Sequence, residues 1–107
     1  MTSRSSSGAL EAVERILNRG GDADAVLLQV VEALHQRAAA WAGIAFVDHA
    51  GDLELGPSAG GRAPDDYQRH VVHWQGEPIA ELWTSADADP ALCARVAVIV
   101  SPYCAKS

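Results

Sequence analysis

Residues 41–55 read Trp41-Ala42-Gly43-Ile44-Ala45-Phe46-Val47-Asp48-His49-Ala50-Gly51-Asp52-Leu53-Glu54-Leu55, and this stretch decides the fold. From Ile44 to Asp48, and again from Leu53 to Leu55, side chains alternate between two faces with the period of two that a β-strand requires. The run His49–Asp52 between them, polar and with a glycine, is typical of a turn. The sequence therefore predicts a β-hairpin over residues 43–55.

A second hairpin is predicted further along the chain, after a loop. Residues Gly56–Asp66 hold three glycines and two prolines in eleven positions, a composition that we expect to exclude a regular element. Alternation resumes over Tyr67–Trp74 and Ile79–Thr84, and the run Gln75–Pro78 between these segments indicates a turn. Two hairpins predict an antiparallel sheet of four or more strands, with one face free for helices.

Helical spacing precedes the hairpins. Apolar residues recur at steps of three and four over Leu10–Leu17, and Gly20-Gly21 marks the end of that helix. A second apolar stripe starts at Val26, after a capping residue at Asp22 or Asp24. We expect this second helix to run to Ala40.

A last helix is predicted after the sheet. Asp89 and Pro90 form a typical helix start, with a capping carboxylate followed by proline at the first helical position. An apolar stripe then runs from Leu92 to Tyr103, and Pro102 predicts a kink or stop near Ser101. The expected fold is therefore α+β, with the N- and C-terminal helices packed together on one face of the sheet.

The composition fits one domain with an acidic surface. The chain has 107 residues and a formal net charge of −6, and no two of its eight Lys and Arg residues are adjacent. We predict a short disordered tail over residues 1–8 and a single domain over residues 9–105. Because no basic stripe is present, we expect binding neither to nucleic acid nor to an anionic membrane.

Two further features bear on location. The longest strongly apolar stretch, Val96–Val100, is far shorter than the roughly 20 residues of a membrane span. The first eight residues lack the apolar segment of a secretory signal. We therefore expect a cytoplasmic protein, and the bias toward Ala, Gly, Arg and Val indicates a GC-rich bacterial source.

Three segments of the chain resemble the GAF domain family. Trp41–Asp48 follows the family's first-strand pattern W-x-G-I/F-x-F/Y, and Leu53–Gly60 follows its second-strand pattern L-x-L-G-P-x-x-G. Gly76–Leu82 follows the later hairpin pattern G-x-x-I-G-x-L-x-V, with Ala80 where a glycine is common. The resemblance covers residues 10–103 and implies a GAF/profilin-like fold that senses small ligands or pairs with other copies in signalling.

The chain departs from the family in the connector between the hairpins. GAF domains usually insert several tens of residues there, and the insert roofs the ligand pocket, whereas Gly56–Asp66 supplies eleven. Eleven residues reach about 36–40 Å when extended, which crosses a sheet but does not enclose a cavity of roughly 300 Å3. The second-strand pattern also resembles the GAF-type free methionine sulfoxide reductases, but their cysteines lie in the missing insert. We therefore expect a trimmed GAF-like domain without that activity.

No set of residues predicts a reaction or a metal site. His70 and His73 are three positions apart in a strand and face opposite sides, while the other two histidines fall in a helix and a turn. A zinc site needs three or four converging ligands, so we predict neither a metal nor a cofactor. Cys93 and Cys104 fall in the last helix about 16 Å apart along its axis, so we predict buried, reduced thiols. We predict no catalytic residues, and we expect that the protein is not an enzyme.

Half of the six aromatic residues are tryptophans. Trp41 falls at the junction of helix and strand, where we predict that it is buried in the core. Trp74 and Trp83 flank the second hairpin, and we predict that they pair across it. Exposed, such a pair would mark a surface for a partner or a ligand.

Two functions follow from these predictions. The leading one is a non-catalytic GAF-like signalling or interaction module, for which the resemblance implies a homodimer through the terminal helices. A helix as short as Leu10–Leu17 is unstable alone, so it must pack either on its own domain or on a second copy. The predicted dimer residues are Leu10, Val13, Leu17, Val96, Val100 and Tyr103. The alternative is a small-molecule sensor with a shallow pocket between the 56–66 loop and the sheet. The candidate ligand- or partner-binding residues are Tyr67, Arg69, His73, Trp74 and Trp83.

Overall fold

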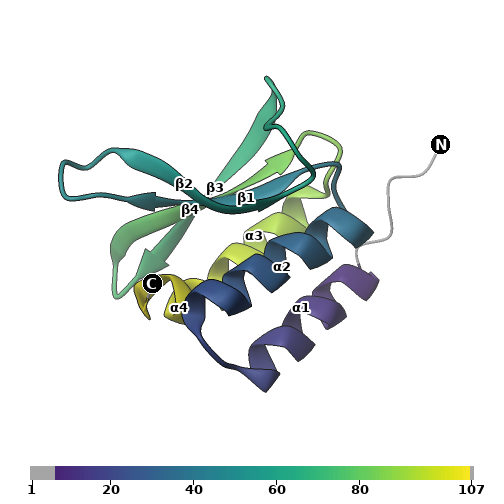
Figure 1. Cartoon of the computed structure of the whole chain (residues 1–107), viewed down its shortest axis with the longest axis horizontal. Helices are drawn as coiled ribbons and strands as arrows, with labels where there is room; N and C mark the ends of the chain where they lie inside the picture. The colour runs from purple at the N-terminus through teal and green to yellow at the C-terminus, as the bar shows by residue number, and fades with distance from the viewer. Residues whose placement is uncertain (1–6, 107) are drawn as a thin grey trace.

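A computed structural model of the chain describes residues 7–106 (Figure 1). Two helices come first, two hairpins follow, and two short helices close the chain. The elements are α1 (Ser7–Arg19), α2 (Ala23–Arg37), β1 (Ala42–Val47), β2 (Leu53–Ala59), β3 (Tyr67–Trp74), β4 (Glu77–Ser85), α3 (Pro90–Ile99) and α4 (Ser101–Lys106). Both predicted hairpins are therefore present.

The four strands form one antiparallel sheet in the order β2-β1-β4-β3. Each hairpin contributes one central and one edge strand, so β1 and β4 meet in the middle of the sheet. The chain must therefore cross from the β2 edge to the β3 edge between the hairpins. The predicted α+β class and the four-stranded antiparallel sheet are confirmed.

The helices cover one face of this sheet, as predicted (Figure 1). α2 packs on β1 and β2, while α3 and α4 pack on β3 and β4. α1 lies on the side away from the sheet, where it packs mainly against α2 and more lightly against α3 (Figure 1). Apolar side chains that are fully buried fill the space between helices and sheet, among them Leu27, Val30, Leu34, Ile44, Val72, Leu82, Val96 and Val100.

Strand β2 is longer than the sequence predicts. Gly56–Ala59 continue the strand, although their glycine and proline content predicts a loop. A proline is tolerated because β2 is an edge strand. The register shifts between Gly43 and Ala45, which leaves Gly56 and Pro57 as a bulge in β2. Gly56 leaves room for the Phe46 ring, because a Cβ there would lie 2.6 Å from it and the ring would have to shift.

The connector between the hairpins is consequently shorter than expected, because only residues 60–66 lie outside strands. The second turn is also tighter. Gln75 and Gly76 alone form it, with φ of 53° and 84°, as in a two-residue type I′ turn. Glu77 and Pro78, which the sequence places in the turn, belong to β4.

The helix ends differ from prediction by a few residues. α1 begins at Ser7, so the end of the predicted 1–8 tail is helical, and residues 1–6 lie outside the described residues. α2 ends at Arg37 rather than Ala40. The predicted break near Ser101 is confirmed, because Val100 separates α3 from α4. None of the helices within residues 7–106 combines the length and apolar character needed to cross a bilayer.

Candidate functional site

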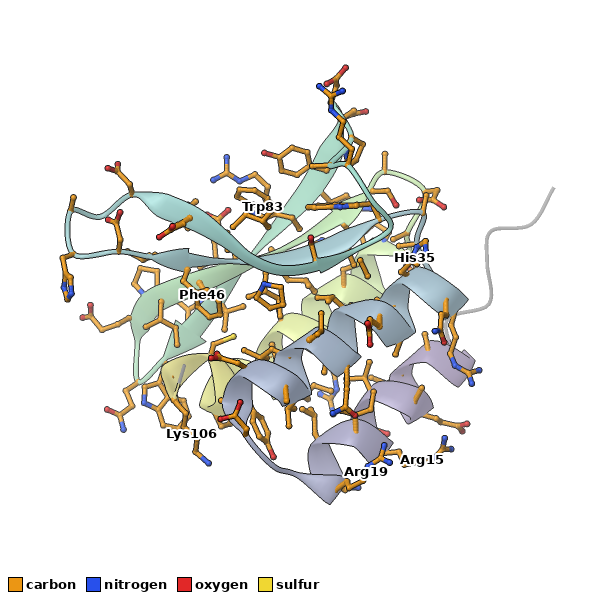
Figure 2. The ribbon with its side chains drawn as sticks, viewed as in Figure 1. Arg15, Arg19, His35, Phe46, Trp83 and Lys106 are labelled. Carbon is orange, nitrogen blue, oxygen red and sulfur yellow. The ribbon has the colours of Figure 1, made fainter. Side chains whose placement is uncertain are left out.

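The face of the sheet turned away from the helices, which we call the outer face, is largely apolar, and several of its apolar side chains are exposed. Strand alternation and register place on it Gly43, Ala45, Val47, Leu53, Leu55, Tyr67, Arg69, Val71, His73, Glu81 and Trp83. Val47, Leu55 and Val71 are 38%, 42% and 43% exposed, a large fraction for apolar side chains. No helix or strand of residues 7–106 covers this face, and the Trp83 side chain projects from it (Figure 2).

Three aromatic rings line one end of the outer face. The Tyr67 ring centroid lies 6.2 Å from that of Trp41, edge to face, and 5.0 Å from that of Trp83. Trp41 is buried, as predicted, but it lies outside the main core and against this cluster. Its Nε1 donates a hydrogen bond of 3.2 Å to the Gly61 carbonyl, which ties the connector to the sheet. Gly43 makes room for the ring, because a Cβ there would lie 2.8 Å from it.

An ion pair lies beside this aromatic cluster. Arg69 Nε donates to Glu81 Oε1 at 2.7 Å, and Trp83 Nε1 donates to the same oxygen at 2.8 Å. The Arg69 guanidinium also lies 5.5 Å from the Trp83 ring centroid, within cation–π range. The Glu81 carboxylate therefore holds both neighbours in fixed positions, and the Tyr67–Arg69–Trp83 group is preorganised.

The titration of these groups reflects that arrangement. Burial alone would raise the pKa of Glu81, but hydrogen bonds from Arg69 and Trp83, together with the Arg69 charge, outweigh it and lower the pKa. The hydrogen bond to Glu81 likewise raises the pKa of Arg69. Both partners are therefore held in their charged forms.

The lowered pKa of Glu81 predicts acid sensitivity. A carboxyl with a lower pKa in the folded protein stabilises it above the unfolded pKa, and this contribution is lost as the pH falls through the folded value. We expect Glu81→Gln to flatten the decline in stability below about pH 4.3, as measured by urea denaturation across that range. Glu54→Gln, on the β2 edge of the same sheet, is the control. If the unfolding free energy of the Glu81 variant falls with acid as steeply as that of the wild type, the prediction is contradicted.

The structure brings together three of the five candidate binding residues, namely Tyr67, Arg69 and Trp83. His73 lies on the outer face but at the far end of β3, next to the turn. Trp74 alternates onto the opposite face. The predicted pairing of Trp74 with Trp83 is wrong, because the tight turn pairs Trp74 with Glu77 and places Trp83 opposite Arg69.

Sequence reasoning missed Glu81, which was not singled out. The sequence did contain a signal, because Glu81 is the single charged residue in the otherwise apolar strand segment Ile79-Ala80-Glu81-Leu82-Trp83. Only the register shows that its charge lies near Arg69.

The predicted dimer residues are mostly used within the protomer. Val13, Val96 and Val100 have no exposed surface, so their side chains cannot contact a second copy. Leu10, Leu17 and Tyr103 are half-buried against the same core. The Tyr103 hydroxyl donates to the Leu17 carbonyl at 2.9 Å, which joins α1 to α4.

Among the described residues, neither the cysteines nor the possible metal ligands form a reactive site. Cys93 and Cys104 are buried free thiols, as predicted. Burial raises the pKa of Cys104 to about 12 and raises that of Cys93 as well, which disfavours the reactive thiolates. Across residues 7–106, no group of three or more His, Cys, Asp or Glu side chains is placed to hold a metal ion.

Neither a family model, nor a curated protein, nor a solved structure matches the chain. The GAF resemblance therefore depends on the three sequence segments and on the order of the elements.

Proposed function

We propose that this protein is a non-catalytic, GAF-like interaction module whose outer sheet face binds a second copy of the chain. The observation that carries the proposal is the apolar, uncovered outer face with Val47, Leu55 and Val71 exposed on it. Exposed apolar side chains gathered on one face of a sheet are characteristic of an interaction site. The dimer is thus proposed on the sheet rather than on the terminal helices.

The residue types on this face support a protein contact. Tyr, Trp and Arg are the side chains that most often dominate binding energy at protein interfaces. Tyr67, Arg69 and Trp83 form one preorganised group, so their ordering costs little on binding. The surrounding aliphatic side chains would exclude water from it.

The size and charge of the face support a second copy as the partner. Four strands spaced about 4.8 Å apart, each rising about 3.3 Å per residue, give a face of roughly 400–500 Å2. Two such faces together approach the roughly 1,000 Å2 at the lower end for specific interfaces, so we expect a dissociation constant on the order of micromolar. Arg69 and Glu81 lie side by side, so each copy would offer both charges to its partner in a two-fold arrangement.

The GAF-like assignment is supported by the order of the elements and by the length of the connector. Helices, two hairpins and a returning helix occur in the order that the resemblance implies. The family's roofing insert is replaced by residues 60–66, which cross from one sheet edge to the other. The surface that a roof would cover is therefore open to a partner.

Light scattering on variants of two exposed valines tests the proposal. Val71 lies on the outer face, and Val98, 64% exposed on α3, is its matched control on a terminal helix. We expect the wild type to be dimeric at about 100 µM, well above a micromolar dissociation constant. Val71→Glu should be monomeric because it places a charge in the interface, and Val98→Glu should remain dimeric.

Two outcomes would contradict this proposal. A monomeric wild type at that concentration removes the dimer altogether. A dimer that Val98→Glu dissociates and Val71→Glu leaves intact moves the interface to the terminal helices. Circular dichroism of both variants verifies that each is folded.

The second candidate function is a small-molecule sensor at the same face. It is supported by the Tyr67–Trp83 stack next to Arg69, which could receive an aromatic ring and an anionic group. A ligand present at 100 times its dissociation constant would add about 2.7 kcal/mol to the unfolding free energy. Thermal shifts with cyclic nucleotides or haem that Trp83→Ala abolishes would favour this function over the dimer.

A further inference from the structure

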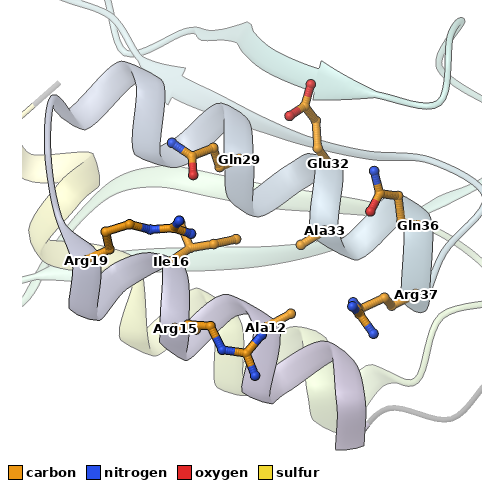
Figure 3. Close-up of a pocket in the computed structure, with 9 residues that line it drawn as sticks. All are labelled: Ala12, Arg15, Ile16, Arg19, Gln29, Glu32, Ala33, Gln36 and Arg37. Carbon is orange, nitrogen blue, oxygen red and sulfur yellow. The ribbon is translucent and has the colours of Figure 1, made fainter.

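A groove between α1 and α2, on the side of the molecule away from the outer face, gathers basic side chains (Figure 3). Arg15 and Arg19 line it from α1, and Arg37 lines it from the end of α2. The chain has only eight Lys and Arg residues and a net charge of −6. Three of these eight basic residues line one groove, so the groove carries positive charge on a protein whose overall charge is negative.

These guanidinium groups have no partner among the residues that the structure describes. Across the described range, no hydrogen bond or ion pair engages the side chains of Arg15, Arg19 or Arg37. One carboxylate, that of Glu32, lines the same groove, and its side chain points away from α1 (Figure 3). The positive charge of the groove is therefore largely uncompensated.

Helix ends explain only part of this arrangement. Arg19 and Arg37 lie in the last turns of α1 and α2, where a positive charge stabilises the helix dipole. Arg15 lies a full turn before the end of α1, where that effect has faded. Arg15 and Arg19 are four residues apart and therefore lie on the same face of α1. Both guanidinium groups thus lie along the groove.

The floor of the groove is open because its central residues are small. Ala12 and Ala33 are nearly buried where the two helices pack, and Ile16 is half-buried beside them. The groove has a volume of about 260 Å3, slightly below the roughly 300 Å3 at which drug-sized pockets begin. Gln29 and Gln36 add amide groups that can donate hydrogen bonds. The groove therefore fits a narrow anion rather than a large ring system.

We infer that this groove binds a small anion with several linked phosphate groups, held by Arg15, Arg19 and Arg37. A guanidinium group binds the oxygens of a phosphate through two parallel hydrogen bonds. A single carboxylate could pair in this way with only one of the three arginines. Guanidinium groups spread along a groove require an anion whose charges are also spread along a chain. Inorganic triphosphate and the phosphate chain of a nucleotide share this chemistry.

Calorimetric titration with inorganic triphosphate at low salt tests the inference. We expect one saturable site per chain, and about a tenfold loss of affinity for each guanidinium removed by Arg15→Gln or Arg37→Gln. Arg95→Gln, which removes an equal charge from an exposed position on α3, should bind as the wild type does. A parallel titration with a nucleoside triphosphate separates the two sources, since equal affinity means that only the phosphates are read.

The inference is overturned if neither anion gives saturable binding to the wild type. It is also overturned if Arg95→Gln weakens binding as much as the groove variants do, because the effect would then be general charge attraction. Circular dichroism melting of each variant ensures that loss of binding is not loss of folding. The readout is independent of the dimer, since the groove and the outer face lie on opposite sides of the helix layer formed by α2 and α3.

Discussion

Gly60→Ala is expected to destabilise the protein by about 2–5 kcal/mol, the combined cost of backbone strain and overpacking. Gly60 has a φ of 105°, which side-chain-bearing residues rarely adopt. A Cβ at this position would lie 2.5 Å from the Ala40 carbonyl oxygen and 3.0 Å from the Trp41 Cα. Both are backbone atoms at the entry to β1, so neither can rotate away. Urea denaturation followed by circular dichroism measures the loss.

Gly61 provides a matched control for this variant. Its φ is also positive, at 80°, but nothing lies within 4 Å of a Cβ built on it. Gly61→Ala should therefore cost only the conformational strain, about 1 kcal/mol. Equal losses in the two alanine variants would contradict the claim that close approach of the connector to β1 requires Gly60.

Trp41→Ala is expected to cost about 3–5 kcal/mol, a large part of the 5–15 kcal/mol that stabilises a typical domain. The ring is 2% exposed and touches Tyr67, and its Nε1 bonds the Gly61 carbonyl. Its removal leaves a cavity and frees the connector at the same time. The unfolding free energy from urea denaturation is again the measurement.

Trp41→Phe separates these two effects. Phenylalanine keeps most of the apolar contact but loses the Nε1 hydrogen bond, so we expect a loss of about 1–2 kcal/mol. If Trp41→Phe destabilises as much as Trp41→Ala, the hydrogen bond to the connector, rather than packing, would be the main contribution of this side chain.

The helices and strands were well predicted because the spacing of apolar residues differs between them, with a period of two in strands and steps of three and four in helices. The alternation in residues 41–55 and 67–84 predicted both hairpins, and Asp89-Pro90 and Pro102 predicted the start and the break of the last helix. Gly56–Ala59 were wrongly predicted as a loop, because their glycine and proline content does not show whether a neighbouring strand is available for pairing. An edge position next to β1 makes that segment a strand despite its composition.

The candidate site was less predictable because it depends on register. Tyr67, Arg69 and Trp83 were identified from their types and their alternation, but their grouping follows from the pairing of Arg69 with Trp83 across the hairpin. A two-residue turn sets that pairing, and the sequence indicated a longer turn. The groove arginines escaped notice for a similar reason, since Arg15 and Arg37 are far apart in the chain and only the packing of α1 on α2 brings them together.

Pro57 has a consequence for how the sheet can grow. It lacks a backbone donor within the edge strand β2, and the bulge that it shares with Gly56 interrupts the regular ladder there. An incoming peptide strand, or a misfolded chain that seeds a fibril, would find no continuous template on that side. Strand addition to this sheet is therefore directed to β3, the one edge whose row of donors contains no proline.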